Sequence, residues 1–455
     1  SHLSFQEYFA ARALCEEGAR LSGPPPWQWS AWWANAARLG NEMGGGFGKG
    51  ILRAAGVEGD VLDLSGKLGG DSTTAAAVLA AVVRSDALTS LNVSSNKLGD
   101  TNGMLLAVAL DSNTRLTQLD LGGNSLDDQS GKAFGEALKR NATLTQLDLG
   151  SNQLGAVSGW AMVEALKSNT HLTSITLDAG VALLIRQLTG ATPLEAINLS
   201  SKALAEASGI VIAHLVKGNS ALTELNVSNN KLGEESGKAF AEVLKTNTKL
   251  KLLNLAGTSL GSESGKALAT ALDSNTTLTQ LNVSSNCKLG DESGKAFAEA
   301  LETNTTLTQL DLGGNSLGDE SGKAFAEALK SNATLTQLDL GGNNLGGECG
   351  QAMVETLKVN AHLTSIALDG VALLVRQLTG AEPVKAINLS SKGLGEASGV
   401  VIAHLIKGNS ALTQLNVSNN KLGEESGKAL AEVLKRNMPL KHLDLGGNQL
   451  PAATV

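Results

Sequence analysis

Residues 307–334 read LTQLDLGGNSLGDESGKAFAEALKSNAT, and this stretch decides the fold. In its first part Thr308, Gln309 and Asp311 face away from the leucines, which is the period of a short strand. In its second part apolar residues recur at helical spacing with charged residues on the opposite side. The leucines are Leu307, Leu310, Leu312 and Leu317, the apolar helical residues are Ala324, Phe325, Ala328 and Leu329, and the charged ones are Lys323, Glu327 and Lys330. The stretch predicts one strand followed by one amphipathic helix.

The same pattern recurs along most of the chain, usually with a step of 28 residues, as from Leu307 to Leu335. A unit with one short strand and one helix cannot bury its apolar face alone, so neighbouring units must stack. The first apolar position of each copy is Leu88, Leu116, Leu144, Leu172, Leu194, Leu222, Leu250, Leu278, Leu307, Leu335, Leu363, Val384, Leu412 and Leu440, after a degenerate copy with Val61, Leu62 and Leu64.

The period, the turn asparagine and the long helix resemble the ribonuclease-inhibitor-like subclass of leucine-rich repeats. The resemblance implies an α/β solenoid shaped as a curved horseshoe, with a parallel β-sheet on the concave face and helices on the convex face. We therefore expect two parts: residues 1–58 as a small helical N-terminal cap and linker, and residues 59–455 as a leucine-rich repeat array of about 15 units. The fold alone does not identify a partner, because one scaffold serves many interactions.

An asparagine recurs directly after the strand of most copies. A short amide side chain can satisfy the backbone groups of a tight turn. We interpret this column as a structural Asn ladder and not as a catalytic row; it comprises Asn96, Asn124, Asn152, Asn230, Asn286, Asn315, Asn343, Asn420 and Asn448.

Composition disfavours several classes of function. The net charge is −8 and the lysines are dispersed, so the chain shows no basic stripe for nucleic acid. The cysteines Cys15, Cys287 and Cys349 lie far apart, which predicts a reduced compartment and no zinc site. No run of eighteen apolar residues and no basic N-terminal region occurs. We expect a cytoplasmic protein without cofactor, metal or membrane span.

Residues 2–14, HLSFQEYFAARAL, break the repeat and resemble the helical segment that precedes the leucine-rich repeats of NOD-like receptors (the NACHT family). Helical spacing places an apolar face on this segment, formed by Leu3, Phe5, Phe9 and Leu14. The resemblance implies that the array is the C-terminal region of such a receptor. The alternative is a cap helix that covers the first repeat, which solenoids need in any case.

Two further segments precede the repeats. After GPPP at 23–26, helical spacing places Trp29, Trp32 and Trp33 on one face, and with Trp27 we interpret them as a structural wedge, with a ligand-stacking platform as the alternative. The run GGGFGKG at 44–50 resembles a phosphate loop, but Met43 and Gly50 stand where that motif requires Gly and Ser or Thr. We therefore predict a flexible hinge there.

Two units, at 172–193 and 363–383, are short and lack the turn Asn. They belong to a duplicated block, because residues 144–247 correspond closely to 335–437. One interpretation is a pair of equivalent docking sites that expose Arg186 and Arg376, with His214 and His404 one repeat further on. The alternative is an old irregularity copied by duplication. Trp160, on the convex side, is a further candidate contact residue because exposed tryptophans often anchor interfaces.

The concave columns consist of Thr, Gln, and Asp or Asn, and contain no Trp, Tyr or Arg anchor. Strong protein binding on that face would therefore be unusual. Carboxylate and amide columns can coordinate a hard cation, but stacked hydrogen-bonded ladders are the simpler expectation.

We find no catalytic constellation in the sequence and predict a non-catalytic protein-interaction scaffold, the ligand-sensing or autoinhibitory repeat region of a NOD-like-receptor-type protein. One alternative is a GTPase-activating protein resembling the Ran activator. Another is a fixed structural subunit of a larger complex. The last unit, from Leu440 to Leu450, lacks its helix, so we expect possible association through this edge.

Overall fold

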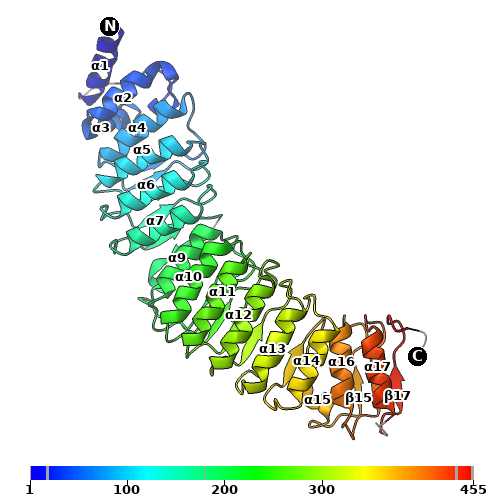
Figure 1. The fold of residues 1–455 in the computed structure, drawn as a ribbon. Coiled ribbons are helices and arrows are strands. Elements are labelled where there is room, and N and C mark those ends of the chain that lie inside the picture. The colour runs from blue at the N-terminus through cyan, green and yellow to red at the C-terminus, as the bar shows by residue number, and fades with distance from the viewer. Residues whose placement is uncertain (1, 17–19, 180, 436–438, 452–455) are drawn as a thin grey trace. The chain divides into compact units, whose positions relative to one another are not determined.

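The computed structural model describes residues 2–16, 20–179, 181–435 and 439–451 (Figure 1). The side chain of Leu3 lies outside the described residues. The chain forms two compact units. Unit 1 comprises residues 1–192 and 202–216, and unit 2 comprises residues 193–201 and 217–455.

Unit 1 contains a helical N-terminal part followed by strands that alternate with helices. The helices are α1 (His2–Cys15), α2 (Ala34–Glu42), α3 (Gly45–Ala54), α4 (Ser72–Arg84), α5 (Asp100–Asp111), α6 (Asp128–Leu138), α7 (Ala156–Leu166), α8 (Ile185–Leu188) and α9 (Glu206–Val216), with 3-10 turns η1 (Pro26–Gln28) and η2 (Ala31–Trp33). The strands are β1 (Val61–Asp63), β2 (Ser90–Asn92), β3 (Gln118–Asp120), β4 (Gln146–Asp148), β5 (Ser174–Thr176) and β6 (Ala182–Leu184). They form one sheet in chain order, parallel except that β6 runs antiparallel to β5.

Unit 2 repeats this organisation with two sheets. Its helices are α10 (Gly233–Thr246), α11 (Ser262–Ser274), α12 (Gly290–Thr303), α13 (Asp319–Ser331), α14 (Gly347–Leu357), α15 (Val375–Thr379), α16 (Glu396–Ile406) and α17 (Glu424–Leu434). Its strands are β7 (Ala196–Asn198), β8 (Glu224–Asn226), β9 (Leu252–Asn254), β10 (Gln280–Asn282), β11 (Gln309–Asp311), β12 (Gln337–Asp339), β13 (Ser365–Ala367), β14 (Leu373–Leu374), β15 (Ala386–Asn388), β16 (Gln414–Asn416) and β17 (His442–Asp444). Strands β7 to β14 form one sheet and β15 to β17 another.

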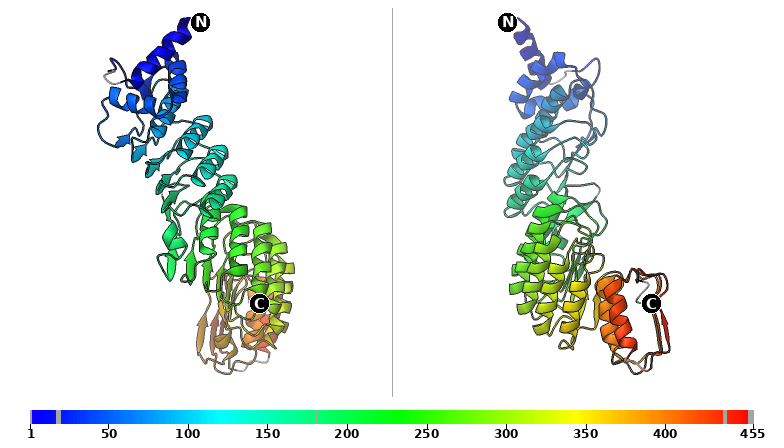
Figure 2. Two further views of the ribbon diagram at one scale, coloured as in Figure 1. Left: turned by 90° about the vertical axis from the view of Figure 1, so that its left-hand side faces the viewer. Right: turned by 45° about the vertical axis from the view of Figure 1, so that its right-hand side comes forward.

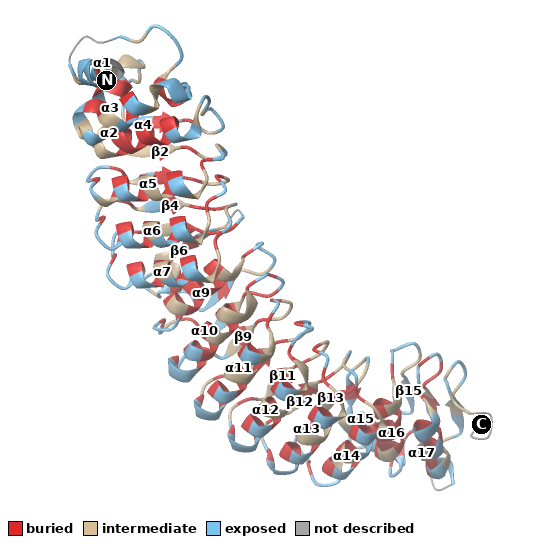
Figure 3. Cartoon of the chain, turned by 45° about the horizontal axis from the view of Figure 1, so that its top comes forward, coloured by how far each residue is buried: buried red, intermediate tan, exposed pale blue. Residues whose placement is uncertain are grey.

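The core of each unit lies between its sheet and its helices (Figure 2). In the copy at 307–334, Leu307, Leu312 and Leu317 are fully buried, as is Phe325 on the helix. Each such side chain contributes roughly 1.5–3 kcal/mol when it leaves water. Figure 3 shows buried and exposed residues alternating along the helices, as expected for helices that bury one face. The predicted α/β organisation, with parallel strands on one side and helices on the other, is confirmed.

Buried turn asparagines connect each repeat to the preceding one. Asn315 is fully buried, and its Nδ2 donates to the carbonyl oxygens of Leu312 (2.8 Å) and Val283 (3.0 Å). Its Oδ1 accepts from the amide of Asn286 (3.0 Å). One side chain therefore satisfies backbone groups of two consecutive turns. Equivalent bonds to the preceding repeat are made by Asn96, Asn124, Asn152, Asn230, Asn286, Asn343, Asn420 and Asn448.

A second asparagine column lies between the end of each helix and the next strand. Asn304 Nδ2 donates to the carbonyl oxygens of Leu272 (2.8 Å) and Asn275 (3.1 Å) in the preceding repeat. Its Oδ1 accepts from the amide of Leu307 (2.8 Å). The sequence analysis does not predict this column, although an Asn recurs three residues before the first leucine of most copies, as Asn304 does before Leu307. This column satisfies backbone groups in the turn before each strand, whereas the Asn ladder does so in the turn after each strand.

Acidic side chains at one helix start bind the start of the next helix. Asp291 accepts from the amides of Gly318 (2.8 Å) and Ser321 (3.2 Å). Burial opposes ionisation of Asp291, but the hydrogen bonds from Ser321 and Gly318 outweigh it and lower its pKa. An anion at a helix N-terminus is also favoured by the helix dipole.

The short units keep this contact without a long helix of their own. Asp369 is the second residue after β13, and its Oδ2 accepts from the amides of Gly395 and Ser398, both at 2.9 Å. Asp178 accepts from the amide of Ala205 in the same way (2.7 Å). As a result α7 packs directly against α9, and α14 against α16.

The prediction of a flexible hinge at 44–50 is wrong. Residues 45–54 form helix α3, in which Phe47 and Ile51 are fully buried. The glycines allow close helix packing, because a Cβ on Gly50 would lie 1.6 Å from the carbonyl oxygen of Leu14 and one on Gly48 would lie 2.1 Å from that of Ala81.

The expected helical face of tryptophans is also wrong. Trp29 precedes the short turn η2, and Trp32 is 66% exposed. Trp29 is buried and stacks on Trp33, with ring centroids 5.0 Å apart. The Pro-rich sequence before η1 replaces a continuous helix by two 3-10 turns, because proline restricts the backbone. Trp27 and Trp29 nevertheless fill the space beside α4.

In α1, the expected apolar face is mostly not the buried one. Phe5 and Phe9 are 65% and 59% exposed, whereas Ala11 and Leu14 are buried. The helix contacts α2 and α3, and its Glu7 accepts from Nδ2 of Asn35 (3.1 Å). The division into residues 1–58 and 59–455 stays a prediction.

We expect Asn315→Ala to lower the free energy of unfolding by about 3 kcal/mol, because it removes the partner of several buried backbone groups. The measurement is urea denaturation followed by circular dichroism, with hydrogen exchange to localise the loss to residues 283–315. Asn254→Ala is the control, since the side chain of Asn254 accepts from the amide of Ala256 in its own repeat (3.0 Å). Equal losses in both variants would contradict the ladder's role.

Candidate functional site

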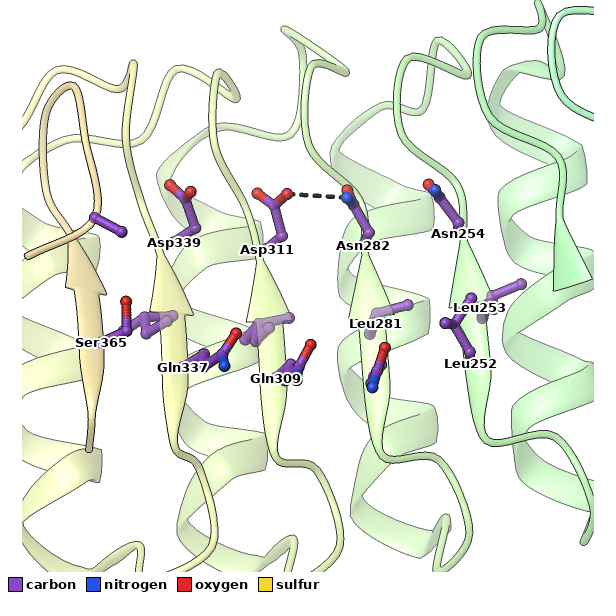
Figure 4. Close-up of a pocket in the computed structure, with 14 residues that line it drawn as sticks. Leu252, Leu253, Asn254, Leu281, Asn282, Gln309, Asp311, Gln337, Asp339 and Ser365 are labelled. Carbon is purple, nitrogen blue, oxygen red and sulfur yellow. Dashed lines mark hydrogen bonds between the residues drawn. The ribbon is translucent and has the colours of Figure 1, made fainter. Parts of the chain in front are cut away.

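A shallow cavity of about 330 Å³ lies on the strand face of unit 2 (Figure 4). It extends across β9 to β13 and is bounded by Ala372, beside the antiparallel strand β14. Two rows of polar side chains cross it, as Figure 4 shows. The upper row contains Asn254, Asn282, Asp311 and Asp339, and the lower row contains Gln280, Gln309, Gln337 and Ser365.

The upper row is oriented by its own turns. Asp311 Oδ1 accepts from the amide of Gly313 (3.0 Å), and Asp339 Oδ1 accepts from that of Gly341 (2.7 Å). Asn282 Nδ2 donates to the second carboxylate oxygen of Asp311 (2.9 Å), the bond drawn in Figure 4. The carboxyl and amide groups are therefore held in place before any partner arrives.

Burial and a neighbouring carboxylate favour the protonated form of Asp339. Burial raises the pKa of Asp339, the amide of Gly341 opposes this, and the charge of Asp311 raises the pKa further. Parallel strands lie about 4.8 Å apart, which brings these side chains close together. A cationic or hydrogen-bond-donating group on this face would relieve the repulsion.

Unit 1 carries an equivalent cavity of about 330 Å³ across β2 to β5. Its rows contain Gln118 and Gln146 below and Asp120 and Asp148 above, and Ala182 of β6 bounds it. Burial raises the pKa of Asp120, the amide of Gly122 opposes this, and Asp148 and Asp63 raise it further. In both units the polar rows end at an antiparallel hairpin.

Within the ranges that the structure describes, no three His, Cys, Asp or Glu side chains gather as metal ligands. No helix within those ranges is both long and apolar enough to cross a lipid bilayer.

Ten segments of the chain match the family model described as Leucine Rich repeat: 87–107, 112–135, 140–159, 218–241, 246–269, 274–298, 303–326, 331–354, 408–431 and 436–450. This chain is a leucine-rich repeat protein. No curated protein matches it in sequence.

Solved structures similar to this leucine-rich repeat protein include "Leiomodin-1 Actin-Binding Site 2 (ABS2)", 25% identical over 28% of this chain and 75% of that one, with a TM-score of 0.26. They also include an internalin from Listeria monocytogenes, 17% identical over 94% of this chain and 93% of that one, with a TM-score of 0.30.

Of the predicted contact residues, His404 lies in a groove of about 320 Å³ on the helix side of unit 2. The groove is lined by α14, α16 and α17, and includes Gln351, the counterpart of Trp160 in the duplicated block. Burial, Lys358 and Lys407 lower the pKa of His404, while Glu355 opposes them.

The remaining contact residues lie elsewhere on the repeats. Trp160 is 42% exposed on α7. Arg186 and Arg376 are exposed on the short helices α8 and α15. His214 is half-buried on α9. Arg376 does not line the groove that holds His404, so the two belong to different surfaces, and their role in docking stays a prediction.

The edge at Leu440–Leu450 is less buried than its counterparts. Leu443 and Leu445 are half-buried, whereas Leu415 and Val417, at the same positions one repeat earlier, are buried. Association through this edge stays a prediction.

An apolar groove of about 370 Å³ lies between α1 and α2, where the sequence predicted an apolar helix face but no groove. It is lined by Phe5, Tyr8, Phe9, Asn35, Arg38 and Leu39.

The cysteines differ sharply in environment. Cys349 occupies the helix position where other repeats carry a serine such as Ser321. Burial, then Asp319 and Asp369, raises the pKa of the Cys349 thiol to about 12. Cys287 is the extra residue of its repeat and is exposed in a left-handed turn conformation (φ 60°). The insertion leaves the ladder intact, because it follows Asn286, whose hydrogen bonds are unchanged in kind.

We expect a thiol-specific reagent at pH 8 to modify Cys287 rapidly and Cys349 only after unfolding, because the thiolate is the reactive form. Mass spectrometry of digested protein after timed labelling measures both rates. Cys287→Ser, the control, should abolish the fast phase. Rapid native labelling of Cys349 would contradict its buried position.

We expect Asp339→Asn to raise the melting temperature at pH 7, since it keeps the acceptor for Gly341 and removes repulsion with Asp311. A carboxyl with a raised folded-state pKa favours folding more as the pH falls through that pKa, so the gain should shrink at acidic pH. Thermal denaturation from pH 7 to pH 3 tests this. Asp291→Asn, at a site of lowered pKa, should instead lower the melting temperature at pH 7.

Proposed function

We propose that this leucine-rich repeat chain is a non-catalytic protein-interaction scaffold and that the strand face of each unit is a partner surface. The observation that carries the proposal is the pair of polar rows on the strand face of each unit. In the upper row of each unit, the aspartate carboxylates accept from the amide two residues later, as Asp120 does from Gly122 (2.9 Å) and Asp339 from Gly341 (2.7 Å). Such groups lose little conformational freedom when a partner binds.

The chemistry of these rows favours partners rich in donors. Gln side chains offer both donors and acceptors, and the carboxylates offer acceptors and negative charge. Because no aromatic anchor stands in the rows, binding energy would be distributed over many contacts. Affinity should therefore depend on the number of repeats engaged and fall with added salt.

The more specific proposal is that the chain is the ligand-sensing or autoinhibitory region of a cytoplasmic NOD-like-receptor-type protein. It is supported by the resemblance of residues 2–14 to the helix that precedes the repeats in that family. In this chain the same residues lie in helix α1.

Site-specific photocrosslinking tests the partner surface. A photoreactive residue at Gln337 on the strand face should capture the partner from an extract of the source cells, whereas one at Glu327, exposed on α13, should not. We expect Asp311→Lys combined with Asp339→Lys to weaken binding at least tenfold, and Glu320→Lys on α13 to leave it unchanged. Capture at Glu327 alone would overturn the surface assignment.

A single-turnover GTP hydrolysis assay with Ran-type GTPases separates the scaffold from the GTPase-activating alternative. We expect the rate of hydrolysis to be unchanged by the chain. Clear stimulation would overturn the scaffold proposal. A partner that co-purifies through high salt would instead favour a fixed structural subunit.

A further inference from the structure

The strand array of unit 2 is interrupted between β14 and β15. Strand β14 pairs with β13 and ends one sheet, and β15 pairs with β16 and begins the next. The interruption follows from the short unit at 363–383, in which the chain folds back as a hairpin. Two strand edges therefore border the same break.

The edge of β15 that faces away from β16 carries unpaired backbone groups. Towards β16, the Lys385 carbonyl accepts from Gln414 (3.0 Å), and the Leu389 amide donates to Asn416 (2.7 Å). Alternate residues of a parallel strand point their backbone groups to opposite sides. The N–H of Ala386 and the C=O of Asn388 therefore face the break, and no residue that the structure describes pairs with them.

A cleft of about 240 Å³ lies between the two edges, lined by leucine and isoleucine side chains and by the polar residues Gln377 and Asn388. Leu373 and Leu378 form its buried part, Leu374 is 48% exposed, and Ile387 is half-buried. An exposed strand edge beside a cleft that can take alternate side chains is the arrangement that receives an added strand. The backbone of such a strand supplies hydrogen bonds, and its alternate side chains enter the cleft.

Two basic residues are next in sequence to residues that line this cleft, Arg376 before Gln377 and Lys385 before Ala386. Arg376 is the second residue after β14 and Lys385 directly precedes β15, and both are exposed. Among the described residues neither forms an ion pair. Residues 370–391 contain these two basic residues and one acidic residue, Glu382, so this segment has a positive net charge in a chain whose net charge is −8.

We propose that the open edge of β15 binds an extended, acidic peptide segment of a partner protein as an added parallel strand. The N-terminal acidic residues of that segment lie beside Lys385 and Arg376, and its alternating apolar residues fill the cleft. The inference rests on the scaffold function proposed above but uses a surface separate from the polar rows.

The probe is the peptide acetyl-DEVTVTV-amide with a fluorescent label at its C-terminus, and the readout is fluorescence anisotropy with the full chain. We expect saturable binding. Two N-methylated isomers of the peptide test the backbone hydrogen bonds. One is methylated on the residues whose amides face β15, and the other on the intervening residues. We expect the first isomer to bind at least tenfold more weakly than the second. Equal affinity of the parent peptide and both isomers would overturn the proposal.

Ala386→Pro is the matched protein variant, because it removes the donor that faces the break and none that pairs with β16. Proline is tolerated at such an open edge. We expect at least tenfold weaker peptide binding with an unchanged circular dichroism spectrum. Arg376→Glu combined with Lys385→Glu should lower the affinity for the acidic peptide and raise the affinity for acetyl-KKVTVTV-amide. Arg186→Glu, at the equivalent position of the other short unit, is the control and should leave binding unchanged.

The failures of the two proposals are distinguishable. Asp311→Lys combined with Asp339→Lys should leave the affinity for the peptide unchanged. The same variant should weaken binding of the partner that is captured through the strand face. Unchanged peptide affinity in Ala386→Pro and in the charge-reversed variant would overturn the added-strand proposal and leave the scaffold proposal standing.

Discussion

The structure depends on one recurring interaction, the buried asparagine amide that satisfies backbone groups of its own turn and of the preceding turn. A leucine-rich repeat has a strand of only three residues, as in β11, and its turns would otherwise leave buried carbonyl groups without partners. Asn315 bonds to the carbonyls of Leu312 and Val283 at once. Stacking is therefore enforced by hydrogen bonding at the turns as well as by the leucine core.

The acidic residues that bind successive helix starts explain how the array tolerates two short units. Asp178 and Asp369 come from the hairpin segments, yet each binds the amides at the start of the following helix. Helix packing continues across the short unit while strand pairing changes direction or stops. The helices of unit 2 are therefore packed without a gap across the short unit, whereas its strands are not. This leaves an open strand edge at β15.

Features that recur in every repeat could be predicted from the sequence, whereas contacts that occur once in the chain could not. The leucine and asparagine periods locate strands, helices and turns because the same residue type occupies the same structural position in copy after copy. The run at 44–50 occurs once, and its glycines allow close packing against Leu14 and Ala81, distant in sequence. The exposure of Phe5 and Phe9 depends on how α1 lies on α2 and α3. The hairpins at β6 and β14 lie in the two short units, which depart from the 28-residue period.

Regularity also limits what the polar rows can specify. Because Gln309 and Gln337, or Asp311 and Asp339, occupy equivalent positions on neighbouring strands, a partner bound to one pair of repeats finds nearly the same chemistry one strand further on. If the strand face binds a partner as proposed, it would supply affinity without fixing the position of that partner along the strands. The interruption at β14 and β15 is not repeated within unit 2, and its hydrogen-bonding groups and basic flank occur at one place. A partner that engages both surfaces would therefore take its register from the interruption and its affinity from the rows.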